Sequence, residues 1–250
     1  MMLKRNLLGW RFEEYWFDEP GYLASTADIV ALRSHATVSN SDCSIPEQTL
    51  LVPLDRSEEA ILAAFDTRTK TSIRQAARDV RVAPAVSAEE RELFYAAYRP
   101  FAAEKGLLIP NAQEESELEI LLARNPQGEL LQAGAFLPAK GAGIYRYRYG
   151  VYVRKSQANA ALLHAAICRA KQLGFAHFDL GGITSGAKPG SKDAGINFFK
   201  SQFGGVVTDS HLYLRGTRLT TRTLLKFLQA SGIASRFHKL SAIAARRARA

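Results

Sequence analysis

The sequence predicts an α/β (α+β) protein in which helices flank both faces of a mixed β-sheet. Two strand patterns, at residues 130–137 and 143–153, are joined by the turn-rich segment 138–142, which favours an antiparallel hairpin. A helical pattern at 158–173 then separates this hairpin from a buried strand at 175–180. Because a helix between two strands of one sheet must pack back onto that sheet, the hairpin and the crossover together predict mixed strand directions.

Periodicity and capping signals place the remaining elements. A helix should begin near Glu58 with Ser57 as its N-cap, and the pattern up to Val80 fits either two consecutive helices or one interrupted helix. Segment 22–38 is compatible with one or two strands. Further helices are expected at 88–105, 116–124 and 195–203, further strands at 49–54 and 206–214, and a helical tail broken near Ser231–Gly232.

Positive charge is concentrated at the C-terminal end. The chain of 250 residues has 33 Lys or Arg against 24 Asp or Glu, a formal net charge of +9. No acidic residue follows Asp209, whereas nine basic residues do, so the rest of the chain is formally neutral with 24 of each sign. Such a segment attracts phosphates, RNA or an anionic membrane surface, or it is a solvated terminal helix.

Composition argues against a secreted or membrane-spanning chain. No stretch approaches the roughly 20 apolar residues of a spanning helix. Residues 1–10 lack the apolar core of a signal peptide, and two cysteines, Cys43 and Cys168, do not suggest a disulfide framework. The sequence therefore predicts a cytoplasmic protein with reduced thiols. A peripheral contact at the inner membrane face through residues 215–250 is left open.

Histidines and cysteines offer little support for other chemistry. The His positions 35, 164, 177, 211 and 238 show no metal-ligand spacing with the cysteines or with clustered carboxylates, so no metal site is predicted. His164 and Cys168 are four residues apart on one predicted helix, where their side chains could touch. Buried helix positions explain this pair better than nucleophilic catalysis does.

Two segments carry the most specific motifs. LGFAHFDLGGI occupies residues 173–183 and AGINFFKSQFGG occupies residues 194–205, with a Gly/Lys/Ser loop between them. Upstream lie TLLVPLD (49–55), SIRQAARD (72–79) and YRYRYG (145–150). With these motifs in this order, over roughly residues 49 to 212, the chain resembles the FemAB family of aminoacyl transferases and related GNAT-like acyltransferases.

This resemblance implies a GNAT-like fold and N-acyl transfer to an amine. FemAB proteins build peptide cross-bridges on peptidoglycan precursors with aminoacyl-tRNA as donor, and relatives with other acyl donors share the fold. The implied domains are an N-terminal extension at 1–56, which would be a reduced first GNAT-like half, a GNAT-like acyltransferase domain at 57–214 and a basic helical tail at 215–250. No tightly bound cofactor is expected. The donor, aminoacyl-tRNA or acyl-CoA, stays open, as does the choice between a cell-wall precursor, an exopolysaccharide precursor and another amine-bearing small molecule as acceptor.

The resemblance places Lys200 at the transfer point. Amide formation passes through a tetrahedral oxyanion, which needs a fixed positive charge or N–H donors. The family motif assigns this position to Lys200 and implies that Phe199 shapes the acyl pocket. Asp179 would act on the attacking amine as a base or orienting group, or it would only bond the glycine loop. Gly181 and Gly182 permit close approaches beside a ligand, or they serve only the turn.

Two arginine clusters are candidate substrate contacts. Lys70, Arg74 and Arg78 recur every fourth residue, so they project from one helix face, and the resemblance implies a phosphate contact with tRNA or a nucleotide-linked acceptor. Arg146 and Arg148 alternate with three tyrosines, Tyr147 among them, so that in a strand the arginines share one face and the tyrosines the other. Arginine forks suit diphosphates or carboxylates. Solvated surfaces with ordinary ion pairs are the alternative for both clusters.

The chain departs from the GNAT pattern at the expected pyrophosphate loop, and a non-catalytic function is the alternative to acyl transfer. A coenzyme-A-dependent GNAT protein has a glycine-rich pyrophosphate loop where this chain reads VRKSQANAALL, without a glycine, although Ser156 or Asn159 could still cap the helix. This lowers the case for acyl-CoA. The alternative function is a non-catalytic binding protein of the same fold that docks on RNA or an anionic membrane surface through its basic tail.

Overall fold

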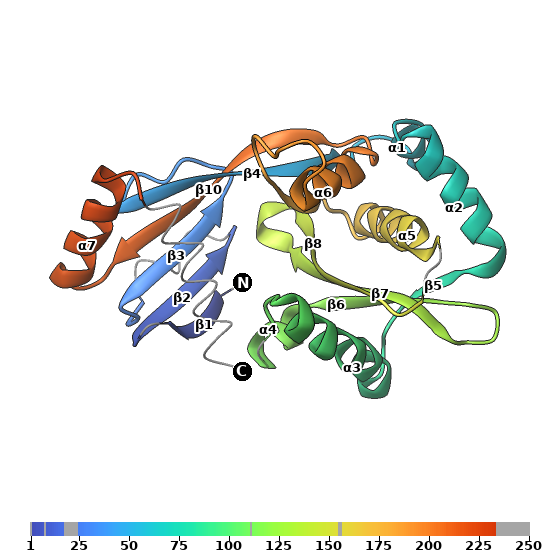
Figure 1. Ribbon diagram of the computed structural model, residues 1–250, viewed down its shortest axis with the longest axis horizontal. Helices are drawn as coiled ribbons and strands as arrows, with labels where there is room; N and C mark the ends of the chain where they lie inside the picture. The colour runs from blue at the N-terminus through green and yellow to red at the C-terminus, as the bar shows by residue number, and fades with distance from the viewer. Residues whose placement is uncertain (1, 8, 18–24, 111, 155–156, 234–250) are drawn as a thin grey trace. The chain divides into compact units, whose positions relative to one another are not determined.

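Figure 1 shows the computed structural model of the protein, which describes residues 2–7, 9–17, 25–110, 112–154 and 157–233. The chain divides into two compact units. The first combines residues 1–48, 105–115 and 208–250, and the second combines residues 49–104 and 116–207. Both units contain strands of mixed direction together with helices, which confirms the predicted fold class. Within the described ranges, no helix is long and apolar enough to cross a membrane.

The first unit combines strands from the N-terminal part of the chain with the last described strand. Its strands are β1 (Met2–Leu7), β2 (Trp10–Trp16), β3 (Ile29–Ser34), β10 (Val206–Gly216) and β4 (Cys43–Pro53), in that spatial order. β1 and β2 form an antiparallel hairpin, β2 and β3 are parallel, and β3 and β10 are antiparallel. Helix α7 (Leu219–Ala230) packs Leu225 and Leu228 against Ile29, Leu212 and Leu214. Tyr15, Val30, Leu32 and Tyr213 form a separate cluster.

The second unit has the strand order β4-β9-β8-β7-β6-β5. Its further strands are β5 (Arg81–Pro84), β6 (Glu119–Arg124), β7 (Leu130–Ala139), β8 (Ile144–Tyr152) and β9 (His177–Ile183). Strands β5 to β8 run antiparallel to their neighbours, whereas β8 and β9 are parallel. Its helices are α1 (Glu58–Ala63), α2 (Thr67–Asp79), α3 (Ala88–Lys105), α5 (Ala158–Gln172) and α6 (Lys192–Ser201). Most residues of α4 (Ala112–Glu117) are assigned to the first unit. Figure 1 shows α5 and α3 on opposite faces of the β6–β8 strands.

The largest described core lies between α5 and this sheet. Residues 162, 163, 166, 167 and 170 of α5 are fully buried, as the 3.6-residue periodicity predicts for a crossover helix. Phe136, Phe178 and Phe203 are also fully buried in this cluster, where each large apolar side chain stabilises the fold by roughly 1.5–3 kcal/mol. The core fixes the register of β9 and the position of the segment that follows α6.

Most predicted elements are confirmed, and one is wrong. The hairpin at β7 and β8, the crossover helix α5 and the last strand are present, and the segment up to Val80 forms two helices. The predicted helix at 116–124 is instead the end of α4 followed by strand β6. Residues 120–123 are all buried, since β6 lies between β5 and β7 and is covered on both faces. An apolar run of this length fits such a strand as well as a buried helix.

Gly204, in the FFKSQFGG motif, occupies a position that a side chain would strain. Its φ is +66°, and a Cβ there would lie 2.6 Å from the backbone oxygen of Ala64. Gly195, in α6 of the same motif, has nothing within 4 Å of a built Cβ. We predict that Gly204→Ala lowers the free energy of unfolding by about 1–3 kcal/mol.

The matched variant Gly195→Ala should raise the free energy of unfolding by about 0.5–1 kcal/mol, because alanine loses less backbone entropy in a helix. Urea unfolding followed by circular dichroism measures both changes. Equal stability of the two variants would mean that the turn after α6 does not require a glycine.

Candidate functional site

The motif residues meet where β8 and β9 stop pairing. The parallel pairs run from Ile144–His177 to Arg146–Asp179, and both strands continue beyond them, to Tyr152 and Ile183. Gly181 follows with a φ of +85°, a conformation that glycine adopts without steric cost. Phe178 and Leu180 face the α5 core, so Asp179 points to the opposite face of the sheet.

Asp179 is fully buried, and its carboxylate accepts hydrogen bonds from three sources. These are the hydroxyl of Thr49 on β4, the guanidinium of Arg146 on β8 and the backbone N–H of Gly181, at 2.7 Å. A carboxylate in such surroundings is held in one orientation with most of its acceptor capacity used. This geometry favours the orienting role of Asp179, including the predicted bond to the glycine loop, over that of a mobile base.

Lys200 reaches the same strand end from α6. Ser191 caps this helix by accepting a hydrogen bond from the N–H of Ala194, and Asp193 lies in the first turn, both favourable at a helix N-terminus. The partly buried Lys200 side chain donates from Nζ to the backbone oxygen of Gly182, at 2.6 Å. A Cβ on Gly181 would lie 3.4 Å from Nζ, so the glycine lets the ammonium group lie close to the backbone.

The surroundings of Lys200 lower its pKa below that of an ordinary lysine. Burial and the nearby positive charge of Arg146 lower the pKa of Lys200, Asp179 opposes them, and the resulting pKa is about 8. At neutral pH the group is therefore mostly protonated and can serve as the cation that an oxyanion requires. It also releases its proton more readily than an ordinary lysine does.

Two polar residues of this region were missed in the sequence analysis. Thr49 supplies a hydrogen bond to Asp179, although it is 130 positions away in the chain. Asn197, one turn before Lys200, donates to the oxygen of Thr184 at 2.8 Å and accepts from the N–H of Thr184 at 3.0 Å. Asn197 and Lys200 thus attach α6 to the same strand end. Thr49 and Asn197 both lie within the motifs quoted from the sequence, but their hydrogen-bond partners are visible only in the tertiary structure.

The predicted alternation along β8 is correct in its first half and wrong in its second. Tyr145 and Tyr147 face the α5 core, while Arg146 lies on the other face with Asp179. The pairing register with β7 then shifts, because Ala135 pairs with Tyr149 and Phe136 with Tyr147, which leaves Arg148 as the extra residue of a β-bulge.

The bulge changes the surroundings of the residues that follow it. Tyr149 contacts Tyr98 of α3, with ring centroids 5.2 Å apart. The guanidinium of Arg148 lies 5.0 Å from the centre of the Tyr149 ring and donates to its hydroxyl at 3.1 Å. Only Arg146 of the two arginines therefore has a described contact with the Asp179 carboxylate.

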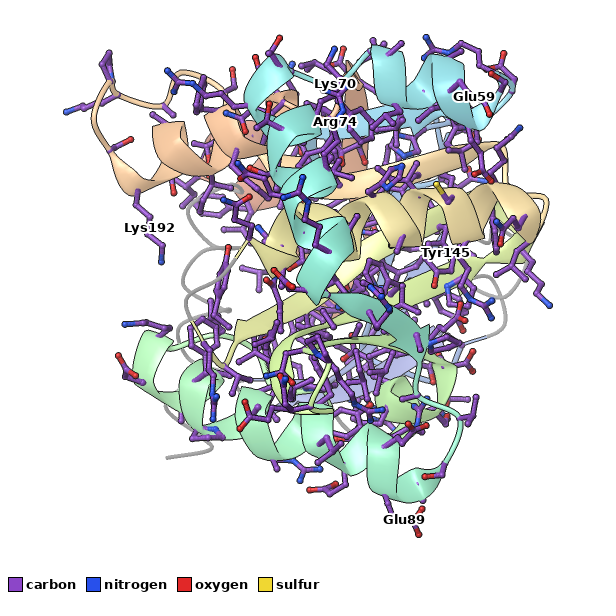
Figure 2. The ribbon with its side chains drawn as sticks, turned by 90° about the vertical axis from the view of Figure 1, so that its right-hand side faces the viewer. Glu59, Lys70, Arg74, Glu89, Tyr145 and Lys192 are labelled. Atoms are coloured by element: carbon purple, nitrogen blue, oxygen red, sulfur yellow. The ribbon has the colours of Figure 1, made fainter. Side chains whose placement is uncertain are left out.

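The remaining predicted contacts are more dispersed. Phe199 is half-buried and packs edge-on against Phe203, with centroids 5.4 Å apart. Burial raises the pKa of the Tyr147 hydroxyl, which occupies the space beside Gly150. Arg74 and Arg78 are exposed on α2, and Lys70 on the same helix donates to the oxygen of Ala63 at 3.1 Å. Figure 2 labels Lys70 and Arg74 on this helix. A ligand contact of this helix stays a prediction.

Of the two residues predicted to cap α5, only Asn159 lies within the described part of the chain, and it does not cap the helix. Gln157 is the N-cap residue and makes no side-chain capping bond, and Ser156 lies outside the described residues. Asn159 instead accepts a hydrogen bond from Gln132 and donates one to the hydroxyl of Tyr152, at 2.9 Å. The Asn159 side chain is therefore engaged with β7 and β8.

His164 and Cys168 do touch, with Nε2 and Sγ 3.5 Å apart. Burial, followed by the charge of Glu58, raises the pKa of the Cys168 thiol to about 11, and burial lowers the pKa of His164. Both shifts disfavour the thiolate–imidazolium pair that a cysteine nucleophile uses. Among the described residues, no group of three or more His, Cys, Asp or Glu side chains could hold a metal ion.

Comparison with known proteins supports the fold. No protein-family model and no curated protein matches the sequence. The structure is similar to that of FemX, with a TM-score of 0.64 and 12% identity over 91% of this chain and 86% of that chain. It is also similar to a C-terminal domain described as that of a lysylphosphatidylglycerol synthetase from Agrobacterium fabrum, with a TM-score of 0.56 and 10% identity over 93% and 85%. A third similar structure is that of L-PGS from Bacillus licheniformis, with a TM-score of 0.52 and 14% identity over 80% of this chain and 73% of that chain. These similarities confirm the predicted FemAB-like resemblance at the level of the fold.

Arg146 and Asp179 shift the pKa of Lys200 in opposite directions, so removing either charge should change this pKa in a predictable direction. We expect Asp179→Asn to lower the pKa of Lys200 below about 8, because the carboxylate is the group that raises it. Arg146→Gln should raise this pKa, because the guanidinium lowers it. Competitive labelling with acetic anhydride across pH, read by mass spectrometry of the Lys200 peptide, measures each shift.

Lys192 serves as the internal comparison in the same samples, because it is exposed on α6 and projects away from the ribbon (Figure 2). Its labelling profile should be the same in both variants. A Lys200 midpoint near 10.4, the value of a lysine in a model peptide, would contradict the described environment.

Proposed function

We propose that this protein is an N-acyltransferase that moves an acyl or aminoacyl group to an amine acceptor, as the FemAB resemblance implies. The observation that carries the proposal is the position of Lys200. Its ammonium group is held at the end of β9 by the oxygen of Gly182, beside a buried Arg146–Asp179 pair and within the FFK motif. Fixed charge of this kind is what a developing oxyanion requires.

The proposed reaction forms one amide bond and breaks one ester or thioester bond. The neutral amine of the acceptor attacks the carbonyl carbon of the donor, and the carbonyl electron pair moves onto the oxygen. Lys200 stabilises this oxyanion with its remaining N–H donors, since an ammonium group has three and Gly182 takes one. Collapse of the intermediate expels the donor oxygen or sulfur with its electron pair, and the proton of the former amine passes to the leaving group or to solvent.

Asp179 is assigned an orienting role in this scheme. Its carboxylate fixes Arg146 and the N–H of Gly181, and it partly offsets the repulsion between Arg146 and Lys200. Phe199 is proposed to border the acyl group, and Tyr147 and Arg148 to line the path of the substrate. Gly181 and Gly182 keep this strand end free of side chains, so that a reacting carbonyl can approach.

The donor we favour is aminoacyl-tRNA. The absence of glycine from the segment VRKSQANAALL weakens the case for acyl-CoA, and the exposed Arg74 and Arg78 offer charge for a tRNA phosphate. The name lysylphosphatidylglycerol synthetase, carried by one similar structure, also denotes an aminoacylated product. The proposed acceptor is an amine-bearing cell-wall or exopolysaccharide precursor.

The first test measures transfer in paired reactions. Aminoacyl-tRNA or acyl-CoA is incubated with candidate amines, and new amides are detected by mass spectrometry. We expect Lys200→Met to lower the rate by about 10²–10³-fold, the usual loss when one oxyanion donor is removed. The control Lys192→Met, on the same helix but exposed, should keep wild-type activity.

Unchanged transfer in Lys200→Met would contradict the proposed role of the ammonium group. Absence of turnover with every donor, together with salt-dependent binding of RNA or vesicles, would favour the non-catalytic alternative.

The pH profile provides a second test of the same assignment. Because Lys200 must be protonated, kcat/KM should fall as pH rises through about 8, the pKa of this group in the free protein. Lys200→Arg should be slower but keep its charge, so its residual activity should not fall in that range. If the variant retained the same alkaline decline, another group would be responsible for it.

A further inference from the structure

Helix α7 has two apolar faces, and only one of them packs on the sheet. Leu225 and Leu228 are buried against β3 and β10. On the other side, Leu219 is 81% exposed and Phe227 is 63% exposed. These two residues and the exposed Thr223 are spaced by four positions, so they form one line along the helix. A helix that served only to cover the sheet would be polar on this side.

Three cations lie along one edge of this line. Arg218, Arg222 and Lys226 are also spaced by four, and their side chains are 65%, 52% and 64% exposed. The side chains of their acidic partners, Asp28 and Asp42, are only 12% and 5% exposed, so the acids lie beneath and the positive groups remain at the surface. The sequence adds five further Lys or Arg and no acidic residue at 234–250.

We propose that the outer face of α7, formed by Arg218, Leu219, Arg222, Thr223, Lys226 and Phe227, docks on an anionic lipid bilayer. Exposed Leu and Phe side chains enter the boundary between head groups and acyl chains, and long basic side chains bind lipid phosphates while their stems stay in the apolar layer. The helix axis then lies parallel to the membrane surface. This docking does not depend on acyl transfer.

Charge alone would fit RNA equally well, but the apolar line favours lipid. Binding to phosphates requires neither Leu219 nor Phe227. A hydrated nucleic-acid backbone also offers no apolar surface in which these two side chains could be buried. Anionic lipid instead satisfies both halves of the face, because it offers phosphate charge directly above a hydrocarbon layer.

Vesicle sedimentation of the full chain tests this inference. We expect the protein to sediment with vesicles of phosphatidylcholine containing about one-third phosphatidylglycerol and to stay in solution with phosphatidylcholine alone. Leu219→Ser/Phe227→Ser should weaken binding at least about tenfold, because it removes the inserted apolar groups. Arg222→Gln/Lys226→Gln should also weaken binding and reduce its dependence on salt.

The matched control is Val86→Ser/Leu173→Ser, which removes two apolar side chains that are 84% and 49% exposed elsewhere in the chain. It should bind as the wild type does. Thermal unfolding of each variant excludes loss of the fold. Phe227→Trp provides a gain of signal, since its indole emission should shift to shorter wavelength on anionic vesicles only.

Three outcomes would overturn the proposal. The wild-type chain could fail to sediment with anionic vesicles. The control pair could weaken binding as much as Leu219→Ser/Phe227→Ser does. Alternatively, a single-stranded RNA oligonucleotide could bind in a manner that depends on Arg222 and Lys226, while vesicle binding is insensitive to Leu219 and Phe227, which would assign the face to nucleic acid.

Discussion

The buried carboxylate of Asp179 is the interaction on which the candidate site depends. A fully desolvated charge is tolerated only when it is paired and hydrogen-bonded, and here the partners come from β4, β8 and β9 itself. The carboxylate therefore joins three segments that are distant in the chain. It does so where the parallel pairing of β8 and β9 ends, and it fixes the first glycine of the motif through its backbone N–H.

This arrangement exposes the ammonium group of Lys200 to opposing electrostatic effects. Arg146, which neutralises Asp179, also repels the ammonium group, and burial adds to that cost. The compensation comes from a backbone oxygen, that of Gly182, and from the partial attraction of Asp179. A cation kept under such conditions interacts strongly with any negative charge that develops nearby, because little water screens it. The same conditions make its proton state sensitive to pH near neutrality.

The division into two units separates these chemical features from the proposed docking face. Lys200, Asp179 and the β8 bulge belong to the second unit, whereas α7 and strands β1, β2 and β3 belong to the first. The basic residues after Asp209 follow Lys200 closely in the sequence, but they are assigned to the other unit and are not part of the candidate site. Arg218, Arg222 and Lys226 are exposed at the start of α7 and along it, above buried acids and beside apolar side chains, and we propose a separate role for them in docking.

Local patterns in the sequence determined the elements whose signals are contained within one segment. The periodicity of α5 and the turn between β7 and β8 were sufficient to predict the crossover and the fold class. The FDLGG and FFKSQFGG motifs led to Lys200 through the family resemblance, and the role of Lys200 stays a prediction. Only the tertiary structure decided that 119–124 is a strand, that Arg148 forms a bulge and that Thr49 and Arg146 hold Asp179. The physical reason is that strand pairing and the partners of a buried charge are contacts between distant residues, whereas capping and periodicity act within a few turns.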